Sequence, residues 1–179
     1  MTAPRRPRLS RDDWLAAGLR TLHADGPGAL GAEPLARRLG TTKGSFYWHF
    51  TDVPAYSAAL LALWQDAAQA ALDTDAAHPA ARLRACAQAI AAPAGDGAAG
   101  AEPAIRAWAA TEPAAARAVA ETDAMRTAQL AEHLAACGIS NPEMARIVLA
   151  TAIGMQALGP PEDASDAIGT LVDLMLALG

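Results

Sequence analysis

Hydrophobic residues recur along most of this chain with the three- and four-residue spacing that is typical of amphipathic helices. The first apolar stripe lies ahead of a glycine–proline break at residues 26–28 and consists of Leu15, Leu19 and Leu22. A serine at position 10 and an aspartate at position 13 precede the stripe in the arrangement of a capping box. Strand-like alternation does not extend beyond a few residues. The pattern therefore predicts an all-α protein.

Two short apolar segments between residues 34 and 50 are separated by a tight turn. Their spacing lets four residues share one buried side: Leu35, Leu39, Phe46 and Phe50. The sequence Gly40-Thr41-Thr42 interrupts them with a glycine and two hydroxyl side chains. We therefore expect a short helix, a turn and a second short helix, with Thr42 as the N-cap of the second.

The second short helix is crowded with hydrogen-bonding and aromatic side chains, namely Lys43, Ser45, Tyr47, Trp48 and His49. Such a helix cannot bury all of these groups in a core of its own. A helix that presents donors and flat rings near its N-terminus suits the major groove of DNA. The pattern therefore indicates a helix-turn-helix with its recognition helix over residues 43–50.

Further apolar periodicities predict six more helices, about nine in total. A fourth helix, capped by Asp52, should run to about Leu72. The later helices are expected near residues 80–92, 102–110, 113–137, 141–158 and 163–178. The last two are apolar over more than one side. A second apolar side needs a covering layer, which either the core of the chain itself or a second subunit can supply.

Charge is divided unevenly along the 179 residues, whose formal net charge is −5. Residues 1–50 carry eight basic and four acidic side chains, whereas the remainder carries six basic and fifteen acidic ones. A basic head on an acidic body suits a protein that offers only its head to a polyanion. The charge distribution alone is explained equally well by a chance division of basic and acidic residues between the two parts of the chain.

The run from Thr41 to Phe50, TTKGSFYWHF, resembles the recognition helix of the TetR family of transcriptional repressors. The resemblance extends back through LARRLG at residues 35–40 and covers about the first third of the chain. It implies a three-helix DNA-binding head joined to a helical body. We expect a basic arm at 1–8, a DNA-binding domain at 9–52 (motif at 31–50), a connecting helix at 53–75, and a ligand-binding and dimerisation domain at 76–179.

The resemblance also implies roles for individual head residues. Base contacts are expected from Lys43, Gly44, Tyr47 and Trp48, and phosphate contacts from Thr42, Ser45, His49 and Gly31. Two alternatives stay open: Trp48 as a packing residue at the rim, and His49 as a helix C-cap. The family carries a lysine three residues after the final phenylalanine of the motif, where this chain has Val53. One backbone contact is therefore in doubt.

Family members dimerise through their last two helices, which form a four-helix bundle with the partner. The resemblance thus implies an interface that includes Val148, Ala152, Met155, Leu171, Leu174 and Leu178. Packing within the core of a single chain is the alternative. A small-molecule effector is also implied, with Trp108, Met125, Gln129 and His133 as candidate pocket residues, although each of them suits a core or a surface equally well.

No arrangement of residues indicates catalysis or a cofactor. The four histidines have no partners at metal-ligand or nucleophile spacing, so we expect neither an enzyme nor a metal site. Cys86 and Cys137 are interpreted as small helix residues, with a redox switch as the alternative. No segment approaches 18 uninterrupted apolar residues, and no apolar run follows the basic start, so a cytoplasmic protein without a membrane partner is expected.

The sequence thus predicts a dimeric, ligand-responsive DNA-binding repressor. The alternative is a helical ligand-carrying or protein-interaction module whose head no longer binds DNA.

Overall fold

The computed structural model describes residues 9–92, 97–158 and 161–178, which fold entirely into helices and connecting turns and confirm the all-α prediction. The helices are α1 (Arg11–Asp25), α2 (Ala32–Arg38), α3 (Lys43–Tyr47), α4 (Val53–Ala70), α5 (Pro79–Ala91), α6 (Glu102–Ala109), α7 (Pro113–Ala136), α8 (Glu143–Leu158) and α9 (Pro161–Leu178). Two 3₁₀ turns, η1 (Pro27–Ala29) and η2 (Ala99–Ala101), precede α2 and α6. The expected basic arm at 1–8 lies outside the described residues.

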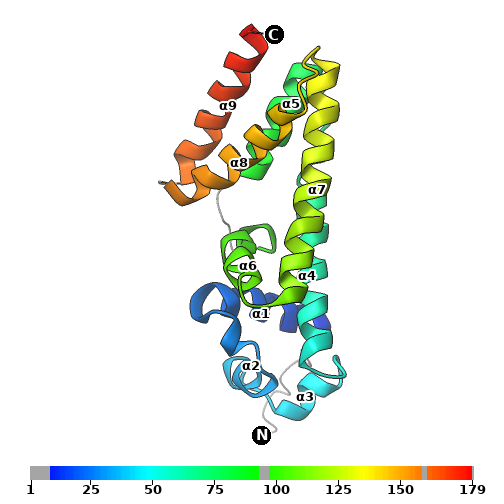
Figure 1. Cartoon of the computed structure of the whole chain (residues 1–179). Coiled ribbons are helices and arrows are strands. Elements are labelled where there is room, and N and C mark those ends of the chain that lie inside the picture. The colour runs from blue at the N-terminus through cyan, green and yellow to red at the C-terminus, as the bar shows by residue number, and fades with distance from the viewer. Residues whose placement is uncertain (1–8, 93–96, 159–160, 179) are drawn as a thin grey trace, which may run out of the picture.

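The helices are arranged along one long axis (Figure 1). The three N-terminal helices gather at one end, and α5, α8 and α9 lie toward the other. Helices α4 and α7 run alongside each other between the two ends, while α6 lies next to α1. Because α4 begins in the N-terminal group and continues into the body, its packing determines how the two parts are joined.

Two apolar clusters stabilise this arrangement. The first combines the interior of α1–α4 with Ile105 and Trp108 of α6 and the first turns of α7. The second is formed by α5, α8 and α9 together with Leu130 and Leu134 of α7. Helix α6 therefore packs with the N-terminal helices, although in sequence it belongs to the body.

Side chains at the starts of α1 and α4 confirm two of the capping predictions, those of Ser10 and Asp52. The Asp13 backbone N–H donates to the Ser10 hydroxyl at 3.1 Å, and the Ser10 N–H donates to the Asp13 carboxylate at 2.7 Å. The Ser10 hydroxyl also donates to this carboxylate at 2.8 Å, and the two hydrogen bonds that the carboxylate accepts from Ser10 hold the pKa of Asp13 below its ordinary value. At α4, the Ala55 N–H donates to the Asp52 carboxylate at 2.7 Å. Both helix starts are therefore specified locally by their sequences.

A hydrogen bond between side chain and backbone ties α1 to α4 inside the first cluster. The Tyr56 hydroxyl of α4 donates to the Trp14 carbonyl of α1 at 2.9 Å, and both residues are fully buried.

The described helices include none that is long and apolar enough to cross a membrane.

Candidate nucleic-acid interface

Helix α3 has only five residues, and an isolated helix of that length is not stable in water. It is anchored by Phe46, whose side chain is fully buried. The Phe46 ring meets the Trp14 ring edge-to-face at a centroid distance of 5.4 Å and lies 5.3 Å from the rings of Phe50 and Tyr56. Aromatic packing against α1 and α4 therefore fixes the position of α3.

The last residue of α3 and its C-cap residue expose two large aromatic side chains. Tyr47 is 47% exposed and Trp48 is 77% exposed, which is unusual for groups of this size. Lys43 is also exposed, and its ammonium nitrogen lies 5.9 Å from the centroid of the Tyr47 ring. These three residues form one cationic and aromatic surface, which we call the α3 face.

The remaining expected contact residues border the α3 face. Thr42 holds the N-cap position as predicted, but its side chain makes no capping hydrogen bond. At Gly44, an added Cβ would approach only the Thr42 hydroxyl, at 3.7 Å, so the exposed backbone there is open to close approach. Ser45 and His49 are half-buried. Their DNA contacts remain predictions, as do those of Gly31 at the N-cap of α2.

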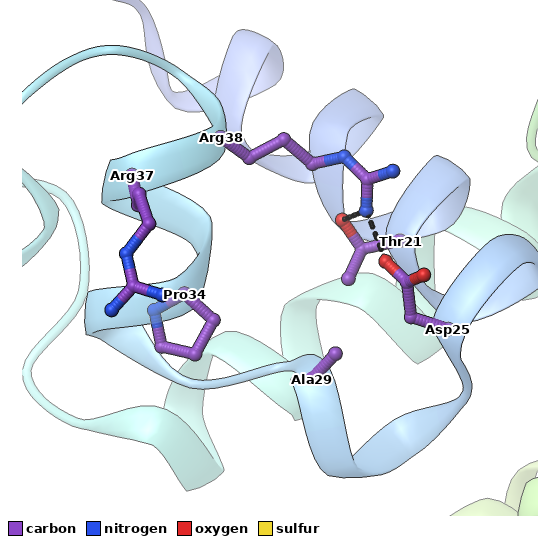
Figure 2. Close-up of a pocket in the computed structure, with 6 residues that line it drawn as sticks. All are labelled: Thr21, Asp25, Ala29, Pro34, Arg37 and Arg38. Carbon is purple, nitrogen blue, oxygen red and sulfur yellow. Dashed lines mark hydrogen bonds and ion pairs between the residues drawn. The ribbon is translucent and has the colours of Figure 1, made fainter.

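An arginine that the sequence analysis did not single out holds α2 against α1. Figure 2 shows the Arg38 guanidinium reaching from α2 to α1, whereas the Arg37 side chain does not turn toward α1. Nη1 of Arg38 donates to the buried Thr21 hydroxyl at 3.0 Å and to the Asp25 carboxylate at 2.5 Å. These residues line a surface depression of about 250 Å³. The link spans 13 and 17 positions in sequence, so no local spacing signals it.

The four candidate effector residues have different surroundings. Trp108 packs in the first apolar cluster, whereas Met125 packs against the second. The Gln129 amide lies 3.5 Å from the Leu72 carbonyl, at the limit of a hydrogen bond. Nε2 of His133 is buried and has no hydrogen-bond partner among the described residues. Of the four, Met125 borders a depression of about 260 Å³ between α4 and α7.

The body contains a buried ion cluster that the sequence analysis missed. Arg126 of α7 donates from both terminal nitrogens to the Glu102 carboxylate of α6, at 2.7 and 2.8 Å. Nε of Arg106 also donates to Glu102, at 2.8 Å, and its terminal nitrogens bind Asp123 at 3.0 and 2.5 Å. Burial raises the pKa of Glu102, but the hydrogen bonds and charges of the two arginines outweigh it and hold the pKa below its ordinary value. The cluster therefore keeps Glu102 ionised inside the protein.

The expected interface residues on α8 and α9 divide into two groups. Val148 and Ala152 are fully buried in the second apolar cluster of the chain itself, so their side chains have no surface left for a partner, contrary to expectation. Met155 and Leu171 are half-buried, and Leu174 is 57% exposed. The Leu178 side chain lies outside the described residues. Ile147 and Leu158, which were not expected at the interface, are also exposed.

Helix α9 is attached to α5 of the same chain by polar groups as well as apolar ones. Arg84 forms an ion pair with Asp173, and the Gln88 amide donates to the Ser165 carbonyl at 3.1 Å.

Both cysteines are free; Cys86 is buried, and burial raises the pKa of its thiol to about 11. That thiol is therefore protonated at neutral pH, a state that disfavours redox reactivity.

Comparison with known proteins agrees with this geometry. Residues 15–52 match the family model of bacterial regulatory proteins of the tetR family. A transcriptional regulator from Rhodococcus sp. Rha1 superposes with a TM-score of 0.77 at 25% identity, over 94% of this chain and 97% of the other. A protein described as a TetR-family transcriptional regulator, also from Rhodococcus sp., gives 0.74 at 20% identity, over 93% and 98%.

A transcriptional regulator from Streptomyces coelicolor A3(2) gives a TM-score of 0.66 at 21% identity, over 90% of this chain and 97% of the other. No functionally curated protein sequence matches the chain. The matched segment contains the whole α3 face, and the structural likeness extends over the body as well.

Proposed function

We propose that this chain, which belongs to the TetR family of transcriptional regulators, is a sequence-specific DNA-binding repressor. It would act as a homodimer on a palindromic operator. The observation that carries the proposal is the α3 face, where Lys43, Tyr47 and Trp48 are exposed along α3 and its C-cap while buried Phe46 anchors the same helix. A mobility-shift assay with duplex DNA from the surroundings of its own gene tests the proposal directly.

Each residue of the α3 face has a chemical role in this proposal. The Lys43 ammonium can donate to guanine O6 or N7 in the major groove. The rings of Tyr47 and Trp48 can contact thymine methyl groups or sugars, and the bare backbone at Gly44 allows close approach to the bases. Thr42, Ser45 and His49, with the backbone N–H at Gly31, would bind phosphates and fix the register of the head.

Replacing Tyr47 by alanine should weaken operator binding by about 5- to 160-fold, because loss of the correct readout at one base pair costs about 1–3 kcal/mol. Binding to random-sequence duplex should change much less, because phosphate contacts carry no sequence information. Fluorescence anisotropy on both duplexes measures the ratio, and Tyr47→Phe separates the ring from the hydroxyl. Equal losses on the two duplexes would remove Tyr47 from the base-reading residues.

The dimer in this proposal forms through the exposed apolar residues of α8 and α9. Ile147 is 47% exposed, Leu174 57% and Leu158 79%, and a charged face would serve a solvated surface better. A twofold dimer presents two recognition helices, which matches an operator with two related half-sites about one helical turn apart. Two heads acting together also bind far more tightly than one.

Changing Leu174 to glutamate should convert the dimer to a monomer and abolish operator binding. In the dimer the new carboxylate would be buried without a partner, which costs several kcal/mol. Light scattering measures the mass of the particle, and anisotropy measures operator binding. Ala116→Glu adds the same charge at an exposed position on α7 and serves as the control. A folded dimer of the Leu174 variant would place the interface elsewhere.

Control by a small, mostly apolar effector in the body completes the proposal. Such a ligand releases DNA only if it binds the DNA-free arrangement of the heads more tightly than the DNA-bound one. Helix α6 packs against both α1 and α7. A ligand in the body that shifts α6 would therefore also act on α1, the first helix of the head.

A further inference from the structure

Arg11, in the first turn of α1, has a position that helix stability does not explain. The N-terminus of a helix carries a partial positive charge, so a cation there is unfavourable. The two acidic residues beside it, Asp12 and Asp13, are the charges that this end favours. Arg11 is exposed, and it has no ion pair among the described residues.

The Arg11 guanidinium is instead placed against the end of the recognition unit. Its central carbon lies 5.3 Å from the centroid of the Phe50 ring. Phe50 is buried, and its backbone N–H donates to the Phe46 carbonyl of α3 at 3.1 Å. A cation is thereby held next to the turn that joins α3 to α4, on a rigid aromatic support.

This placement leaves the donors of Arg11 available. A guanidinium stacks on a ring through its flat face, whereas its five N–H groups point outward from its edge. The edge of a stacked guanidinium can therefore still bind a phosphate through two parallel hydrogen bonds. Nothing else in this turn carries a positive charge, because residues 50–55 read Phe-Thr-Asp-Val-Pro-Ala.

We propose that Arg11 binds a DNA phosphate beside the C-terminal end of α3, and that its cation–π contact with the Phe50 ring positions it for this role. The inference rests on the proposed DNA-binding function and adds a contact from α1, outside the helix-turn-helix motif. The contact is sequence-independent, so it should affect operator and random DNA alike.

The test is a salt titration of binding to a random-sequence duplex of about 30 base pairs, long enough for two half-sites. Each lost phosphate contact lowers the slope of log affinity against log salt by about 0.9. Arg11→Gln should therefore show a slope shallower by about 0.9 for each head that contacts the duplex. Arg11→Lys keeps the charge and should retain the wild-type slope. Arg20→Gln removes another exposed arginine from the same helix and should leave the slope unchanged.

A wild-type slope in Arg11→Gln would overturn the contact and leave Arg11 as a cover for Phe50. The melting temperature separates the two roles, because a covering role changes it without changing the slope. If the Gln variant did not fold, Arg11→Met would remove the charge and keep an apolar side chain over Phe50; a slope shallower than that of Arg20→Gln would support the contact, and equal slopes would overturn it. Failure of the wild-type protein to bind any duplex would instead overturn the proposed function, and this contact with it.

Discussion

Replacing Glu102 by glutamine is expected to lower the melting temperature by about 10 °C. Glu102 and Arg126 are both almost fully buried, and Glu102 accepts both terminal nitrogens of Arg126. Removal of one partner from a buried ion pair leaves an uncompensated charge and costs about 3–5 kcal/mol. For a chain of this length, each kcal/mol shifts the melting temperature by about 2–4 °C. Differential scanning calorimetry measures the change.

Two control variants separate burial from charge in this experiment. Glu143→Gln breaks the ion pair with Arg146, whose partners are both more than half exposed, and should change the melting temperature very little. Replacing Glu102 by leucine and Arg126 by methionine together removes both buried charges and should recover most of the lost stability. A Glu102→Gln variant that melts like the wild type would show that the pair contributes little to stability.

Acid should weaken the same cluster. The pKa of Glu102 lies below its ordinary value in the folded chain, so its carboxylate stabilises the fold at pH values above the ordinary pKa. That contribution is lost as the pH falls through the lowered, folded-state pKa. Part of the fall in melting temperature on acidification should therefore be absent in the glutamine variant.

The sequence predicted those parts of the fold that depend on local spacing. The serine–aspartate capping box, the Asp52 cap and the apolar stripes of α1 and α4 each lie within a few residues of the chain. The head motif was equally local, since residues 41–50 contain both the turn and the exposed row of α3. Local signals of this kind are read directly from hydrophobic period and cap chemistry.

Contacts between distant segments were not predictable in the same way. Glu102 is 24 residues from Arg126, and in sequence each is an ordinary charged residue on an amphipathic helix. The family resemblance also placed Val148 and Ala152 at an interface, because hydrophobic periodicity shows that a helix has two apolar sides but not which side faces its own core. Only the packing of α5 and α9 against α8 decides this, and it leaves Ile147 and Leu174 exposed instead.

Gly18 is the position on α1 where the smallest substitution should have a large effect. It lies in the interior of the helix, where alanine normally stabilises by about 0.5–1 kcal/mol relative to glycine. Here an added Cβ would lie 1.8 Å from the Tyr56 hydroxyl oxygen and 3.1 Å from a Leu60 methyl carbon. Both residues are fully buried on α4, so the close approach of α1 and α4 depends on the missing side chain.

Gly18→Ala should therefore destabilise the chain, with a net loss of about 1–3 kcal/mol from overpacking. Displacement of Tyr56 would also break the hydrogen bond to the Trp14 carbonyl and leave a buried acceptor unpaired. Chemical denaturation measures the free energy of unfolding. Tyr56→Phe removes the oxygen that the new methyl group would overlap, so the double variant should lose less than the sum of the two single losses. Additive losses would mean that α1 and α4 separate without the proposed overlap. A gain in stability from Gly18→Ala alone would show that the two helices do not approach this closely in solution.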